Sequence, residues 1–419
     1  MRRRAESSSH RRGTSGPPFE VAALGLAWVL LSGSHPVLKL LGRVPAQELW
    51  RADLRTLETW GLASVSASRF VEARRSFRVD VALAVMREAG VGFVGYGSPL
   101  YPEELTHLGY PPAGLFYKGH PGALPALSRM PRITVVGTRR ATAYGLRAAT
   151  AFTQAFAEAG VAVVSGLALG IDGQAHQATL EVGGLTVAVL GCGVDVVYPR
   201  RHWRLYARVA KEGLLLSELP PGTAPTRWTF PQRNRLLAAL GDAVLVAEGS
   251  RTSGAMQTAA EAACLGRPVF AVPGPFDVEN HSGCNRLLYD GALPALEPRE
   301  TVQDFLEETR IARAGRDCWS SWRVASGDVT QSSSLVEEDG PSQRVGLGAS
   351  EEIRRLSDSP ARALDRARVL EELVAEPRSI DDLVVRTGLT ARRVAVLLAE
   401  LEVGGKIVQM GPGLYIRAP

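Results

Sequence analysis

The sequence predicts an α/β protein in which a parallel sheet follows a helical region and precedes a winged helix. Segments between the predicted strands, such as 145–159 and 252–265, are rich in Ala and Leu and predict helices. This strand–helix repeat predicts βαβ units with right-handed crossovers and a sheet covered on both faces. The six β-rich runs, spaced by roughly 25 to 29 residues, are 133–137, 161–166, 186–191, 214–219, 243–248 and 268–273.

The rest of the chain differs in composition from this block. Apolar residues at helical spacing, including Leu24, Trp28 and Leu31, predict helices after residue 19, and a Gly, Pro and Tyr-rich stretch predicts an extended connector at 95–125. Low periodic hydrophobicity predicts disorder at both ends of the block. The expected organisation is a disordered basic tail at 1–18, a helical domain with its connector at 19–125, a core of alternating strands and helices at 126–310, a disordered linker at 311–361 and a winged helix at 362–419.

The winged helix is predicted from three helices and a hairpin. An amphipathic helix covers 363–375, Ser379 and Thr390 are the N-caps of two more, and 407–416 forms a hairpin. Arg392 and Arg393 lie on the expected recognition helix, but residues 362–419 carry nine basic and eight acidic residues. We therefore expect protein contact there, with duplex binding as the alternative.

Net charge gives little information about function in this chain. Its formal charge is +5, yet residues 1–18 carry five arginines against Glu6, whereas 131–310 carry 17 basic and 17 acidic residues. The positions of the charged residues are therefore more informative about function than the net charge.

The cysteines and the N-terminal region bear on the compartment of the protein. The four cysteines form no CxxC pair, which predicts free thiols. The basic start and the apolar run at 21–31 resemble a signal peptide, but that run is too short to span a bilayer, so we expect a cytoplasmic protein with no membrane partner.

Small residues and arginines recur in the loops after the predicted strands. Because ligands bind at the carboxyl ends of such strands, these loops should converge on one edge of the sheet. Gly137-Thr138-Arg139 precedes a helix, whose free N–H groups and dipole favour an anion that Arg139 can also bind. Gly166 opens a second such turn, and Arg200 extends a basic rim on which Arg201 and Arg204 are interpreted as solvated.

The segment 230–235 combines a ring with charge. Phe230 can stack on a base, while Arg233 and Arg235 can neutralise a phosphate backbone. The alternative is a buried Phe230 beneath a basic helix start.

The turn at 165–172 does not have the spacing of a dinucleotide-binding loop. It lacks the GxGxxG pattern, and no acidic residue that could bind a ribose follows the first strand at the expected distance. Both observations argue against NAD binding.

Catalytic and metal motifs are missing from the sequence. It contains no GxSxG, HExxH or Walker A run, and no cofactor is expected. Asp172 and His176 stand four residues apart, and we interpret them as capping or hydrogen-bonding groups because two ligands do not make a metal site. Phosphate recognition without a nucleophile, metal or base indicates binding.

These motifs resemble those of the DprA/Smf family of bacterial DNA-processing proteins. The matching stretches are 136–139, 165–172 with 175–176, 188–195 running to 198–199, 217–218, 230–235, 253–254 with Thr258, and 272–274. The resemblance implies an extended Rossmann-like core, a helical domain of sterile-alpha-motif (SAM) type and a winged helix. It further implies a homodimer that binds single-stranded DNA, protects incoming strands and loads the RecA recombinase during natural transformation in competent cells.

Residue roles follow from the same resemblance. It implies that phosphates contact Arg139, Gly166, Arg200, Arg233 and Asn234, that a base meets Phe230, and that Ser253 and Gly254 line the pocket floor. Arg235 is added to the expected DNA-binding residues from the charge of segment 230–235. Ala141 and His202 replace a proline and an asparagine that are common in the family, which affects the first turn and one rim contact.

Two other functions stay open. The segment 253–261 is similar to the PGGxGTxxE loop of nucleoside-monophosphate phosphoribohydrolases, with Glu261 as the candidate catalytic carboxylate, although the double glycine is missing. The third possibility is a winged-helix transcription regulator with a ligand-sensing core.

Overall fold

The computed structural model describes residues 19–30 and 36–309, and in the C-terminal part 360–373, 378–389, 394, 397–398, 401, 406–411 and 414–417. The chain divides into two compact units after residue 332. The predicted basic tail and almost all of the predicted linker lie outside the described residues.

A nine-stranded sheet forms the centre of the first unit, in the order β1-β2-β6-β5-β4-β3-β7-β8-β9. All neighbours from β6 to β9 pair in parallel, whereas β1 and β2 add antiparallel strands at one edge. The parallel strands are β3 (Arg132–Gly137), β4 (Ala162–Ser165), β5 (Thr186–Val189), β6 (Leu214–Ser217), β7 (Ala243–Glu248), β8 (Val269–Ala271) and β9 (Leu293–Pro294).

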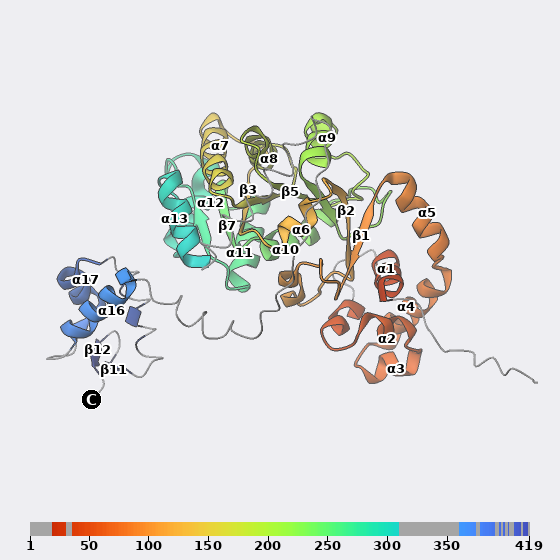
Figure 1. The fold of residues 1–419 in the computed structure, drawn as a ribbon, viewed down its shortest axis with the longest axis horizontal. Helices are drawn as coiled ribbons and strands as arrows, with labels where there is room; N and C mark the ends of the chain where they lie inside the picture. The colour runs from red at the N-terminus through yellow and green to blue at the C-terminus, as the bar shows by residue number, and fades with distance from the viewer. Residues whose placement is uncertain are drawn as a thin grey trace, which may run out of the picture. The chain divides into compact units, whose positions relative to one another are not determined.

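Helices cover both faces of this sheet (Figure 1). Four pack on the face that carries Ile133, Val135 and Ala188: α7 (Ala143–Glu158), α8 (Ile171–Glu181), α9 (Trp203–Glu212) and α13 (Pro298–Thr309). Four others pack on the face that carries Val136 and Val244: α6 (Ala123–Leu127), α10 (Thr229–Leu240), α11 (Gly254–Cys264) and α12 (Ser282–Tyr289). The strand order reverses between β3 and β7, which is where ligands bind in open sheets of this kind.

The predicted α/β fold class is confirmed, because each of the six β-rich runs contains one strand of the parallel sheet. Short 3-10 turns interrupt the connections at η2 (Glu103–His107), η3 (Arg200–His202) and η4 (Glu279–His281). The strands consist almost wholly of buried aliphatic residues, as a sheet covered on both faces requires.

The N-terminal region is helical, as predicted, and packs directly on the edge of the sheet. It contains α1 (Phe19–Val29), η1 (Pro36–Gly42), α2 (Ala46–Arg51), α3 (Leu54–Thr59), α4 (Ser64–Ser76) and α5 (Val79–Ala89). Trp28 of α1 meets Phe116 edge to face, with ring centroids 6.0 Å apart. The predicted connector differs from expectation, because β1 (Gly92–Gly95) and β2 (Gly114–Gly119) form a pair that joins the sheet beside β6.

The second unit has the features of a winged helix. It contains α16 (Pro360–Glu372), α17 (Ile380–Thr387) and a three-stranded sheet of β10 (Arg378–Ser379), β12 (Leu414–Arg417) and β11 (Ile407–Gly411). Ser379 caps α17 as predicted, in a reciprocal capping box with Asp382. The predicted cap Thr390, and Arg392 and Arg393 of the expected recognition helix, lie outside the described residues.

Candidate nucleic-acid interface

Five loops from the carboxyl ends of the strands meet around one groove of about 640 Å³, which we call the strand-end groove. The loops after β3, β4, β5, β6 and β7 contribute to its walls, and the N-terminal part of α10 completes them. Its lining includes Thr138, Arg139, Arg140, Asp172, Tyr198, Arg227, Phe230, Arg233, Asn234, Ser250, Ser253 and Gly254. The structure therefore brings most of the sequence-predicted site residues together at the point where the strand order reverses.

A buried glutamate holds the loop that carries Arg139. The backbone N–H of Thr138 donates to the Glu248 carbonyl at 2.7 Å, and the backbone N–H of Thr142 donates to the Glu248 carboxylate at 3.0 Å. Thr142 then caps α7 by accepting from the Gly145 N–H at 3.1 Å. Gly145 is required here because any larger side chain would collide with the Glu248 carboxylate. Arg139 is exposed on this fixed loop and is available to an anion.

The turn from Gly166 to Asp172 is held by buried polar groups. Leu167 adopts a left-handed conformation (φ 55°), and its backbone N–H donates to His176 Nε2 at 3.2 Å. Burial lowers the pKa of His176 to about 3, so the ring is neutral at pH 7. Burial raises the pKa of Asp172, while the charge of Arg233 opposes this shift. The interpretation of His176 as a hydrogen-bonding group is confirmed.

Aromatic rings form one wall of the strand-end groove. Phe230 is half-buried, and its ring lies 5.3 Å from that of Tyr198 at an interplanar angle of 36°. The guanidinium of Arg139 lies 5.1 Å from the Phe230 ring centroid. Phe230 and Tyr198 also border a smaller cavity of about 50 Å³ above Gly191 and Cys192. The alternative of a Phe230 sealed in the core is therefore wrong, because its ring is half-buried and borders both spaces.

Arg233 is placed differently from the expectation of a phosphate contact. Its side chain is buried at the floor of the groove, with a residue exposure of 5%. Its Nη1 donates to the carbonyls of Gly166, at 2.8 Å, and of Val189. A side chain at Gly166 would collide with this guanidinium. Both residues therefore hold the loops after β4 and β5 together, because Nη1 of this guanidinium binds a backbone oxygen in each segment.

Arg235 is also engaged elsewhere. Its Nη1 donates to the Tyr110 carbonyl at 2.8 Å, and its Nη2 pairs with the Glu218 carboxylate. Arg235 does not line the strand-end groove, so the expectation that it contacts a phosphate is corrected: it links α10 to the segment around Tyr110.

Arg200 begins η3 and is exposed. It lies outside the lining of the strand-end groove but directly follows Tyr198 and Pro199, which line the small cavity.

The start of α11 forms the opposite side of the groove. Ser253 is the N-cap, and its hydroxyl accepts from the Ala255 N–H at 3.3 Å. Gly254 begins the helix and is exposed, while Asn234 Nδ2 donates to its carbonyl at 3.5 Å. An 11-residue helix that starts at a groove presents free N–H groups and a positive dipole end to an anion.

Three exposed residues of the groove region were not predicted from sequence. Arg140 lines the groove beside Arg139, and Arg227 lines it from the segment before α10. The guanidinium of Arg227 lies 4.7 Å from the ring of Trp228, whose exposure is 66%. An arginine followed by two aromatic residues, Trp228 and Phe230, is the sequence signal that could have found this pair.

Metal-ligand clusters and a catalytic carboxylate in the groove would indicate an enzyme, and the described residues bear on both. That part of the chain contains no group of three or more His, Cys, Asp or Glu residues that could hold a metal ion. Glu261 lies on α11 but is not in the lining of the strand-end groove. The three cysteines that the structure describes are free, and none of the described helices is long and apolar enough to cross a membrane.

Comparison with known proteins identifies the family. The family model described as DNA recombination-mediator protein A matches residues 92–308, and the one described as DprA winged helix domain matches residues 355–413. The Protein Smf of Synechocystis is 32% identical over 398 residues, which cover 94% of this chain and 97% of that protein. The chain belongs to the DprA/Smf family.

Other DprA/Smf proteins agree with this assignment. The DNA processing protein DprA of Bacillus subtilis is 39% identical over 229 residues, which cover 55% of this chain and 76% of that protein. The X-ray structure of DprA from Streptococcus pneumoniae superimposes with a TM-score of 0.60 at 30% identity, covering 70% of this chain and 99% of that one. The Rossmann-like core and the C-terminal winged helix are thus the architecture expected of a DprA/Smf protein.

Proposed function

We propose that this protein binds single-stranded DNA in the strand-end groove and acts as a recombination mediator. The observation that carries the proposal is the combination on one edge of the sheet: exposed Arg139, Arg140 and Arg227 lie in the lining that also contains the Phe230 and Tyr198 rings. Positive charge along a groove with rings for successive bases is how sequence-tolerant single-strand binding is achieved.

Within the groove, each element has a distinct role in the proposal. Arg139 and the N-terminus of α11, at Ser253 and Gly254, bind phosphates from opposite sides. Phe230 receives a base, with Asn234 beside it, and Arg200 extends the basic surface past Tyr198. Gly166 and Arg233 shape the floor. Duplex bases are already stacked on each other, so this ring wall selects an unpaired strand.

Membership of a recombination-mediator family supports a wider role. We propose that the protein protects incoming strands and loads RecA onto them during natural transformation, in the cytoplasm and as a homodimer. We also propose that residues 19–125, 126–310 and 362–419 are its helical, DNA-binding and winged-helix domains, joined by disordered segments at 1–18 and 311–361.

The proposal includes binding without catalysis and without a cofactor. The absence of Glu261 from the groove lining supports this view, since a catalytic carboxylate has to reach the bound nucleotide. Incubating the protein with nucleoside monophosphates and finding released free base would overturn it.

Fluorescence anisotropy with a labelled oligothymidylate tests the binding proposal. Four exposed arginines at Arg139, Arg140, Arg200 and Arg227 predict a plot of log affinity against log salt with a slope of about −3 or steeper, at about −0.7 per neutralised phosphate. A blunt duplex of the same length should bind much more weakly. Equal affinity for duplex, or a flat salt dependence, would reject the groove as a single-strand site.

Filament assembly tests the mediator role. RecA is blocked by a single-strand-binding protein on a long single strand, and this protein is then added. Relief of the block supports loading. A block that persists although the protein binds the strand would leave a binding protein without a mediator role.

A further inference from the structure

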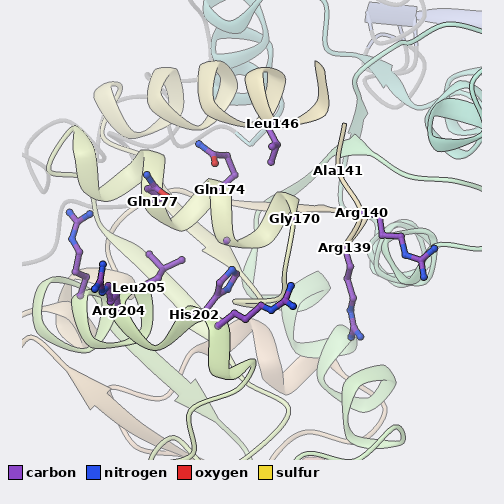
Figure 2. Close-up of a pocket in the computed structure, with 13 residues that line it drawn as sticks. Arg139, Arg140, Ala141, Leu146, Gly170, Gln174, Gln177, His202, Arg204 and Leu205 are labelled. Carbon is purple, nitrogen blue, oxygen red and sulfur yellow. The ribbon is translucent and has the colours of Figure 1, made fainter. Parts of the chain in front are cut away.

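A second basic groove lies next to the strand-end groove, on the face of the sheet that α7, α8 and α9 cover (Figure 2). We call it the helical-face groove; it encloses about 550 Å³ between the start of α7, α8 and the segment from η3 into α9. Its lining contains five arginines and no acidic side chain: Arg139, Arg140, Ala141, Leu146, Gly170, Gly173, Gln174, Gln177, Arg201, His202, Arg204, Leu205 and Arg208. Such one-sided charge attracts a polyanion.

The two grooves are continuous through one loop. Arg139 and Arg140 belong to the lining of both, and in Figure 2 they project from the loop before α7 on the side opposite Arg204. A strand whose phosphates are bound by this loop in the strand-end groove can therefore continue toward α9 without leaving a basic surface.

Most of these arginines have no acidic partner among the described residues. Arg208 pairs with Glu212 at 3.3 Å, but no ion pair of Arg201 or Arg204 is found in that part of the chain. Both are exposed. The guanidinium of Arg204 instead lies 5.1 Å from the ring of Trp203, whose exposure is 58%. An exposed ring beside unpaired arginines repeats the combination of Arg227 and Trp228 at the first groove.

Two fixed side chains shape the helical-face groove. His202 Nδ1 is bound to the carbonyl of Leu167 at 3.1 Å, and Gln174 Nε2 donates to the Thr150 hydroxyl at 2.8 Å. A side chain at Gly173 would collide with the His202 ring, so glycine at this position lets α8 and η3 approach each other. The groove is thus built by packed elements.

We infer that the helical-face groove is a second binding segment for the phosphate backbone of the same single strand, entered over Arg139 and Arg140. This inference rests on the proposed function and extends it: the binding site is longer than the strand-end groove, and the interpretation of Arg201 and Arg204 as merely solvated is replaced. The ligand is recognised by its charge, so no sequence preference is expected from this groove.

The test measures affinity against oligothymidylate length, from about 4 to about 16 nucleotides, the range of site sizes known for single-strand-binding domains. The test variant carries both Arg201→Ala and Arg204→Ala. For the shortest oligonucleotide to which the wild type binds, its affinity should equal that of the wild type. For the longest it should bind roughly tenfold or more weakly, because hydrogen bonds to charged groups are worth at least about that factor. Its salt slope on long strands should be smaller in magnitude by about 1.4, at about 0.7 for each of two phosphates.

Arg286→Ala is the control, since Arg286 is an exposed helix arginine outside both grooves that lies over a ring, Tyr289, as Arg204 lies over Trp203. Unlike Arg204, it also pairs with a carboxylate, that of Asp290. Wild-type affinity of the double variant for long strands would overturn the inference, and so would an equal loss in the control or on short strands. In each of these outcomes binding of short strands by the wild type still supports the proposed function. If the wild type binds neither length, the proposed function fails and the inference fails with it.

Discussion

Replacement of Arg233 by methionine distinguishes a structural arginine from a phosphate ligand. In the structure its Nη1 donates to two buried carbonyl oxygens, on Gly166 and Val189, and its charge lies near buried Asp172. Methionine fills a similar volume but donates no hydrogen bond. Each buried acceptor left without a donor costs about 1–3 kcal/mol, so the free energy of unfolding should fall by about 2–6 kcal/mol.

Urea unfolding followed by circular dichroism measures this loss. Arg251→Met is the control, because Arg251 is exposed and such substitutions usually change stability by less than about 0.5 kcal/mol. At a temperature where the Arg233 variant stays folded, its salt slope for single-stranded DNA should match that of the wild type. Unchanged stability together with a salt slope smaller by about 0.7 would refute the structural role and indicate a direct phosphate contact.

Three further predictions concern the groove and its support. Phe230→Ala should weaken binding of an oligothymidylate by about 1–3 kcal/mol in anisotropy titrations. Phe276→Ala is the control and should not weaken binding, because the Phe276 ring is 93% exposed and lies outside the groove lining. Equal affinities of the two variants would indicate that Phe230 has only a packing role. Arg139→Ala should reduce the magnitude of the salt slope by about 0.7, and an unchanged slope would show that Arg139 does not neutralise a phosphate. Burial lowers the pKa of His176 from 6.5 to about 3. Between pH 3 and pH 6.5 the unfolded chain therefore binds a proton at this residue that the folded chain does not bind. The free energy of unfolding that this neutral ring contributes above pH 6.5 is lost as the pH falls toward 3. The wild type should lose about 1 kcal/mol per pH unit more than His176→Gln across that window, and parallel unfolding curves for the two proteins would contradict the neutral buried ring.

The sheet was predictable because its strands are short aliphatic runs at a constant spacing. A strand such as 243–248 is buried on both faces, so its composition alone separates it from the Ala-rich helices. The pair β1 and β2 was not predicted, because the Gly, Pro and Tyr residues between Gly95 and Gly114 hide a long connection between two short strands. The pairing of β2 with β6 joins residues such as Phe116 and Ser217, which are far apart in the chain.

The convergence of the loops was predictable, but the role of each arginine within them was not. The rule that parallel strands end at one edge places Arg139, Phe230 and Ser253 together. Whether an arginine reaches solvent depends on distant acceptors: Arg233 meets carbonyls 67 and 44 residues away, and Arg235 meets one 125 residues away. Local sequence makes 233 and 235 look as accessible as Arg227, which lines the groove.

Photocrosslinking tests the central claim most directly. An oligothymidylate carrying 5-iodouracil at one internal position is bound to the full chain and irradiated, and the modified peptides are identified by mass spectrometry. The account predicts crosslinks at Phe230 and Tyr198, whose rings border the strand-end groove, and their loss when an unlabelled single strand competes. Crosslinks confined to the winged helix or to α12, with none at these two rings, would contradict it.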